Sequence, residues 1–70
     1  MKKIIYTNHA IVRRIERDIE EKTIELVVGQ PDYIKTTSEG KKIAIKNVDN
    51  KIMSVVYIEK DTHIKVITVY

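Results

Sequence analysis

One histidine and three arginines lie close together near the N-terminus of the 70-residue chain. His9 precedes Arg13, Arg14 and Arg17, the only arginines among 13 cationic residues, the rest of which are lysines. A guanidinium group grips phosphate through two parallel hydrogen bonds, whereas an ammonium group acts as a point charge. Histidine, with an unperturbed pKa of about 6.5, suits a general acid or base. The cluster therefore indicates a site that handles phosphate.

The same residues also fit an ordinary solvated helix surface. Glu16, Glu20 and Glu21 are near enough in sequence to pair with the arginines, and exposed ion pairs of this kind are common and weak. His9 alone could fill a polar corner of a first helical turn. The combination of His9 with an arginine-only cluster favours the functional interpretation.

A first helix is expected to carry this cluster over residues 8–17, capped by Thr7 or Asn8. At about 100° per residue, the helix has an apolar side and a polar side. The apolar side, expected to face the protein, carries Ile11, Val12 and Ile15. The polar side, expected to face outward, carries His9, Arg13 and Arg17, with Arg14 beside them.

A second helix is expected over residues 19–28. Asp18 and Glu21 have the spacing of a capping box. An apolar stripe follows at positions 24, 27 and 28. Gly29 suits the left-handed position after a helix, and Pro31 cannot continue one.

Short strands make up most of the rest of the chain. Alternating apolar residues and turn residues predict strands over 4–6, 33–37, 42–46, 52–58 and 64–70. In the last strand, Ile64, Val66, Thr68 and Tyr70 are expected on one face and Ile67 and Val69 on the other. The predicted fold class is α+β, a single domain over residues 1–70 in the order β-α-α-β-β-β-β. Two N-terminal helices would cover one face of a four- to five-stranded antiparallel sheet.

Composition excludes several classes of protein. A hydrophobic content of 43% is too high for a disordered chain. Without cysteine the chain has neither disulfides nor thiolate metal sites, and no motif indicates a metal or a cofactor. No apolar run approaches the ~20 residues that span a bilayer, so we expect a cytoplasmic protein without membrane contact. A net charge of +3 permits nucleic-acid binding without demanding it.

Further candidate RNA contacts lie late in the chain. Tyr57, Thr68 and Tyr70 fall on predicted strands, and tyrosines can stack on bases or donate a hydrogen bond to phosphate. Tyrosines more often pack in a core or at an edge. Lys46 belongs to a set of lysines that could track a phosphate backbone or simply keep edge strands from aggregating.

Residues 7–19 read TNHAxxRxxxRxI and resemble the opening of a family of short prokaryotic domains of unknown function, typically TxHAxxRMxxRGIS. Residues 29–32 (GQPD) resemble the turn before that family's first hairpin. Residues 55–57 (VVY) and 66–70 (VITVY) resemble its ending. The resemblance covers nearly the whole chain. This chain departs from the pattern at three positions, having Arg14 for a methionine, Asp18 for a glycine and Glu20 for a capping serine.

The family is often grouped with the fold of the RelE, ParE and BrnT toxins, in which helices precede an antiparallel sheet. The resemblance therefore implies a RelE-like domain, a ribonuclease activity and an antitoxin protein as partner. His9, Arg13 and Arg17 match the family's polar motif, whereas Thr68 and Tyr70 match its last strand.

Together, these observations favour a metal-independent endoribonuclease in which the ribose 2′-hydroxyl attacks its own phosphate. His9 would act as general acid or base, and Arg13 and Arg17 would stabilise the transition state. Tyr70 or Tyr57 would carry the second proton or stack on a base. The remaining RNA contacts are expected from Arg14, Tyr57, Thr68 and Lys46. The alternative is a non-catalytic module that binds protein or nucleic acid, such as an inactive toxin relative.

Overall fold

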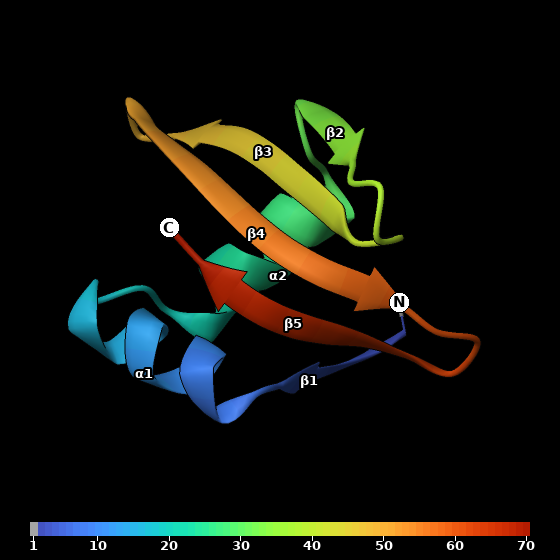
Figure 1. Ribbon diagram of the computed structural model, residues 1–70. Coiled ribbons are helices and arrows are strands. Elements are labelled where there is room, and N and C mark those ends of the chain that lie inside the picture. Colours follow the sequence, from blue (N-terminus) through green and yellow to red (C-terminus); the bar gives the residue numbers. More distant parts are fainter. Residues whose placement is uncertain (1) are drawn as a thin grey trace.

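A computed structural model describes residues 2–70 of the chain. The elements, in chain order, are β1 (Lys3–Tyr6), α1 (Asn8–Glu16), α2 (Glu21–Gly29), β2 (Tyr33–Thr36), β3 (Lys42–Val48), β4 (Lys51–Glu59) and β5 (His63–Val69) (Figure 1). The predicted α+β class and the order β-α-α-β-β-β-β are confirmed. Neither helix exceeds nine residues, and no helix within residues 2–70 has the length and hydropathy to cross a bilayer.

The five strands form one sheet in the order β1-β5-β4-β3-β2. The pairs β2–β3, β3–β4 and β4–β5 are antiparallel, as expected for consecutive hairpins. The pair β1–β5 is parallel, so the expectation of a wholly antiparallel sheet is wrong at this edge. Because β1 and β5 are the first and last strands, their pairing is not constrained by a short turn.

Each helix begins and ends for a local reason. The Thr7 hydroxyl accepts a hydrogen bond from the amide of Ala10 at 3.1 Å, which confirms Thr7 as the N-cap of α1. Asp18 adopts a left-handed backbone (φ 54°) that takes the chain out of α1. The predicted capping box is wrong, because Glu20 is the N-cap of α2 and its side chain makes no capping hydrogen bond. Gly29 is the last residue of α2 and does not adopt a positive φ.

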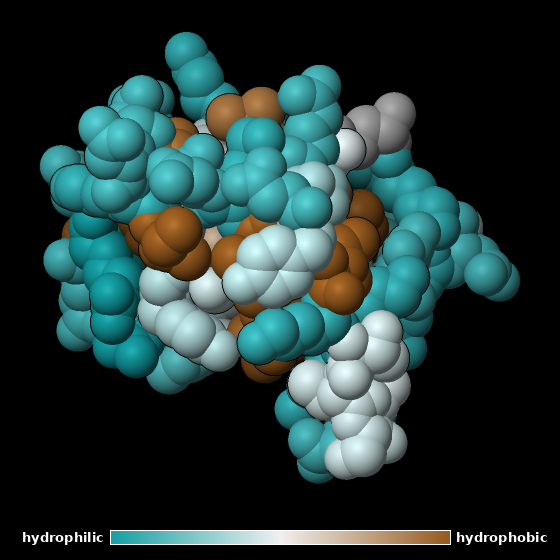
Figure 2. Space-filling view, turned by 90° about the horizontal axis from the view of Figure 1, so that it is seen from above, coloured by the Kyte–Doolittle hydropathy of each residue, from teal (hydrophilic) through white to brown (hydrophobic). Residues whose placement is uncertain are grey.

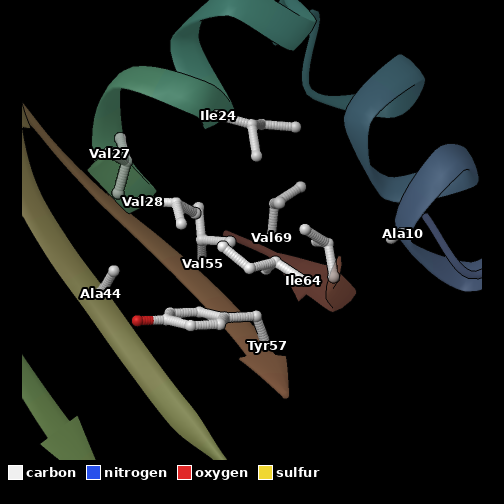
Figure 3. Packing of buried hydrophobic residues seen from close by; sticks show 10 residues of the cluster. Ala10, Ile24, Val27, Val28, Ala44, Val55, Tyr57, Ile64 and Val69 are labelled. Carbon is white, nitrogen blue, oxygen red and sulfur yellow. The ribbon is translucent and has the colours of Figure 1, made fainter. Parts of the chain in front are cut away.

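The hydrophobic core lies between the helices and one face of the sheet (Figure 3). The stripe predicted on α2 is confirmed, because Ile24, Val27 and Val28 are all buried. Only Ala10 of α1 is fully buried. The strands contribute Ala44, Val55, Tyr57, Ile64, Val66 and Val69.

The orientation predicted for α1 is wrong. Ile11 and Val12 are exposed, and Ile15 retains 65% of its accessible surface. The side facing the sheet carries Ala10, flanked by the half-buried side chains of Arg13 and Arg14. A methyl side chain lets the helix approach the sheet closely, and the aliphatic stems of arginine can cover apolar surface while their head groups reach water.

An irregularity in β5 decides which of its residues reach the core. Val56 of β4 pairs with Thr68, whereas the next residue, Tyr57, pairs with Val66, so Ile67 is an extra residue in β5. The bulge shifts the alternation of faces by one residue. Val69 therefore joins the core and Thr68 lies on the opposite face, which corrects the predicted assignment.

The second face of the sheet is uncovered. In Figure 1 the strands lie in front of α2, and no helix or strand of residues 2–70 crosses the face turned to the reader. From above, where β2 and β3 lie, hydrophobic residues show as separate areas between hydrophilic ones (Figure 2). We call the side with the helices the covered face and the other side the open face.

Candidate active site

The position of α1 is fixed by its attachment to β5. The amide of Thr7 donates to the carbonyl oxygen of Val66 at 3.1 Å, and the Thr7 hydroxyl donates to that of Ile67 at 2.9 Å. From this point α1 runs beside the C-terminal half of β5, and the C-terminus lies at the same end of the molecule as α1 (Figure 1). These bonds place the start of α1, which carries His9, beside the last strand.

His9 is exposed in the first turn of α1, and within residues 2–70 its side chain makes no hydrogen bond or ion pair. Arg13 follows four residues later, about 6 Å further along the helix axis. Its Nη1 atom lies 3.8 Å from Glu16 Oε1, while its Nε atom is buried without a partner among the residues described. His9 and Arg13 thus share one flank of α1, with the stem of Arg13 held by packing.

Arg14 occupies the opposite flank of α1 and faces α2. Its Nη1 atom donates to the carbonyl oxygen of Ile19 at 3.1 Å, and its Nη2 atom lies 3.9 Å from Glu21 Oε1. Burial raises the pKa of the nearby Tyr6, and the carboxylates of Glu21 and Glu25 raise it further. Arg14 is therefore engaged between the two helices and is not positioned as the RNA contact that the sequence suggested.

Arg17 lies at the C-terminal end of α1, about 12 Å along the axis from His9. It lines a hollow of about 240 Å³ between the α1–α2 connection and the β3–β4 turn, with Ile19 and Met53 among its other walls. Neither His9, Arg13 nor Tyr70 lines this hollow. The structure therefore groups His9 with Arg13 and leaves Arg17 about two turns away.

Tyr70 and Thr68 lie on the open face. Tyr70 exchanges two backbone hydrogen bonds with Ser54, at 2.7 and 2.9 Å, so the chain end is held against β4. Its side chain is 46% exposed. Thr68 is half-buried opposite Val56. Because Arg14 faces α2, the flank of α1 with His9 and Arg13 faces away from α2.

Two other predicted contacts lie on the covered face. Tyr57 is 3% exposed in the core, and burial raises the pKa of its hydroxyl. A ring in this position cannot stack on a base or exchange a proton with RNA, so its predicted role is wrong. The Nζ atom of Lys46 lies 3.6 Å from Asp32 Oδ1, so the carboxylate of Asp32 partly neutralises the charge of Lys46.

No group of three or more His, Asp or Glu side chains within residues 2–70 could hold a metal ion.

Tyr33 was not among the candidate residues selected from the sequence. Tyr33 pairs with Ile45, Ile45 pairs with Ser54, and Ser54 is hydrogen-bonded to Tyr70. The two tyrosines therefore end one row across the open face. The alternation within each strand was readable in the sequence, but the register between strands was not.

A family model described as "Domain of unknown function (DUF4258)" matches residues 6–70. This agrees with the expected family of short domains of unknown function. No curated protein and no solved structure gave a significant match.

Proposed function

The chain belongs to the DUF4258 family of domains of unknown function, and we propose that this member is an endoribonuclease that needs no metal ion. The observation that carries the proposal is the placement of His9 and Arg13 one turn apart on a flank of α1. That flank faces away from α2, and α1 contacts β5, the strand that directly precedes Tyr70. An exposed imidazole next to an anchored guanidinium is the pair that phosphate transfer within RNA requires.

In the proposed reaction, His9 removes the proton from a ribose 2′-hydroxyl. The 2′-oxygen attacks the adjacent phosphorus, and the guanidinium of Arg13 stabilises the added negative charge on the non-bridging oxygens. The bond to the 5′-oxygen breaks, and the leaving oxygen takes a proton from the Tyr70 hydroxyl. The products are a 2′,3′-cyclic phosphate and a 5′-hydroxyl. The nucleophile belongs to the substrate, so this step requires no metal-bound water.

Arg17 takes a different role from the one the sequence suggested. At about two helical turns from His9, it cannot readily share one phosphate with both His9 and Arg13. We assign it to a neighbouring phosphate of the RNA backbone. Grouping with the RelE, ParE and BrnT toxins, and an antitoxin as partner, remain proposals that rest on the resemblance of the sequence motifs.

The decisive experiment measures cleavage of a labelled single-stranded RNA in excess EDTA. His9→Ala and Arg13→Ala are each expected to slow cleavage by roughly 10²- to 10⁴-fold. Lys22→Ala is the control, because it removes an exposed cationic side chain of α2, away from the flank with His9 and Arg13, and should retain activity. The product should carry a 2′,3′-cyclic phosphate. Equal cleavage by wild type and by both α1 variants would eliminate this assignment.

A non-catalytic module remains the second candidate. It is favoured by the exposed apolar side chains of α1, Ile11, Val12 and Ile15, which are suited to contact with a protein. Binding of RNA with no cleavage product, under the conditions above and across pH 5 to 9, would select this candidate. Retention of binding in His9→Ala would then show that His9 is dispensable for affinity.

A further inference from the structure

Each face of the sheet carries three lysines, and the two faces differ by one acidic residue. Glu59 is the only acidic residue in the five strands, and it lies on the covered face because it pairs with the buried Ile64. By alternation from the core residues, Lys3, Lys35 and Lys65 lie on the open face. Every charged strand residue of the open face is therefore a lysine, which favours an anionic ligand there.

Aromatic rings stand at both ends of one row on this face. The row runs Tyr33, Ile45, Ser54 and Tyr70, and we call it the tyrosine row. With strands about 4.8 Å apart, the two tyrosines are separated by about 14 Å. Tyr33 is 54% exposed and Tyr70 is 46% exposed, so both rings are accessible.

The neighbouring row places a cation beside these rings. Lys35 pairs with Ile43, which pairs with Val56, which pairs with Thr68. Lys35 lies two residues from Tyr33 on β2, and Thr68 lies two residues from Tyr70 at the other end. Each ring thus has a phosphate-binding or hydrogen-bonding neighbour about 7 Å away along its strand.

The aliphatic residues between the rings contribute little exposed surface. Ile45 is 8% exposed and Val56 is 9% exposed, although no helix or strand covers them. The exposed aliphatic residues of this face, Ile5 and Ile52, lie on β1 and at the start of β4, near opposite ends of the sheet. A ligand would therefore meet rings and ammonium groups rather than a continuous aliphatic patch, which disfavours an apolar protein helix.

We propose that the open face is a platform for single-stranded nucleic acid, on which Tyr33 stacks with a base and Lys35 and Lys65 contact phosphates, with Tyr70, the proposed proton donor, at the other end of the tyrosine row. Rings and lysines on an uncovered sheet face are the combination that binds unpaired bases. This inference rests on the proposed function, because it names the surface that would hold the RNA beside His9 and Arg13.

The test uses a fluorescently labelled DNA oligonucleotide, which lacks the 2′-hydroxyl and cannot be cleaved by the proposed reaction. Binding is measured by fluorescence anisotropy, so a failure of catalysis leaves this measurement intact. Tyr33→Ala should weaken binding roughly 5- to 150-fold, the range expected for loss of one base stack. Tyr33→Leu, which keeps apolar bulk on β2, should weaken it comparably.

Ile34→Ala is the matched control. Ile34 is adjacent to Tyr33 on β2 and is similarly exposed, at 47%, but it lies on the covered face because it pairs with the buried Ala44. Lys35→Gln should lower the salt dependence of binding by about 0.7 in the slope of log K against log salt. Lys22→Gln, on α2, should leave that slope unchanged.

Equal affinities for wild type, Tyr33→Leu and Ile34→Ala would overturn the platform and would leave the open face to a protein partner. Binding of a duplex at least as tight as that of the single strand would also overturn it. A third outcome separates the two proposals. If Tyr33→Ala and Tyr33→Leu lose affinity for the oligonucleotide but the wild type does not cleave RNA, the open face binds nucleic acid and the proposed catalysis is wrong.

Discussion

The hydroxyl of Thr7 donates a hydrogen bond to the carbonyl oxygen of Ile67, 2.9 Å away, across 60 residues of sequence. The same oxygen atom of Thr7 accepts the amide of Ala10 and so caps α1. One side chain therefore starts the helix that carries His9 and joins it to β5, the strand that directly precedes Tyr70. Ile67 is also the extra residue of the β5 bulge. The hydrogen bond from Thr7 therefore lies at the point where the side chains of β5 shift from one face of the sheet to the other.

Replacing Thr7 by valine should loosen this join. Valine keeps the shape of threonine but has no hydroxyl, so the helix cap and the bond to Ile67 are both lost. The free energy of unfolding should fall by about 1–2 kcal/mol, measured by urea denaturation. Thr7→Ser keeps the hydroxyl and should lose much less stability. Equal stabilities of the two variants would show that the hydroxyl contributes nothing.

The inverted orientation of α1 gives a second prediction. Ile15→Gln changes an exposed position and should alter the free energy of unfolding by no more than about 0.5 kcal/mol. Ala10→Leu places three extra carbons where no surface is exposed, and should cost about 1–3 kcal/mol or more. Thermal unfolding followed by circular dichroism compares the two. If Ile15→Gln were the more destabilising, α1 would have the orientation that its hydrophobic pattern alone predicts.

The error over α1 has a clear physical origin. Hydrophobic periodicity predicts which side of a helix is apolar, and on α2 that side is the buried one. On α1, close approach at Ala10 and the long stems of Arg13 and Arg14 replace aliphatic burial. Residue hydrophobicity does not record that an arginine stem can serve as core-facing surface.

Strand positions were predictable, whereas register and pairing were not. Alternation located β3 and β4, and turn residues located the hairpins between them. The parallel pairing of β1 with β5 and the extra residue Ile67 depend on contacts between distant segments. The candidate site shows the same division. His9 and Arg13 could be chosen from spacing on one helix, whereas the tyrosine row required the registers of four strands.

The stability of the protein should depend on pH through Glu59. Its carboxylate accepts hydrogen bonds from Lys2 Nζ at 2.9 Å and Lys42 Nζ at 3.0 Å, and these, led by the bond from Lys2, lower its pKa. A carboxyl whose pKa is lowered by folding adds stability above its unfolded pKa, about 4.3, and loses it as pH falls through the folded pKa. The wild type should therefore exceed Glu59→Gln in stability above about pH 5 and converge with it at lower pH.

Urea denaturation of both proteins between pH 2.5 and 7 measures this difference. Salt provides the control, because the groups are exposed and about 1 M salt should shrink the difference at neutral pH. Parallel curves for wild type and Glu59→Gln at every pH would contradict the assignment of the lowered pKa to Glu59.

Adjacent arginines on α1 should respond in opposite ways to the same substitution. Arg14→Gln removes a hydrogen bond to Ile19 and the ion pair with Glu21, and should lower the free energy of unfolding by about 0.5–1.5 kcal/mol. It should leave the rate of RNA cleavage by the folded protein within a few-fold of wild type. Arg13→Gln should affect stability less, because within residues 2–70 the ion pair of Arg13 is a 3.8 Å contact with exposed Glu16, and it should slow cleavage strongly.

Denaturation curves and single-turnover cleavage rates on the same preparations separate these effects. Stability loss alone cannot slow cleavage at a temperature where each variant is fully folded, so a slow Arg14→Gln would place that guanidinium at the RNA. The reverse pattern, slow cleavage by Arg14→Gln and normal cleavage by Arg13→Gln, would mean that the flank of α1 facing α2, rather than the flank with His9, meets the substrate. The expected pattern instead assigns Arg14 to the junction of the helices and Arg13 to the phosphate.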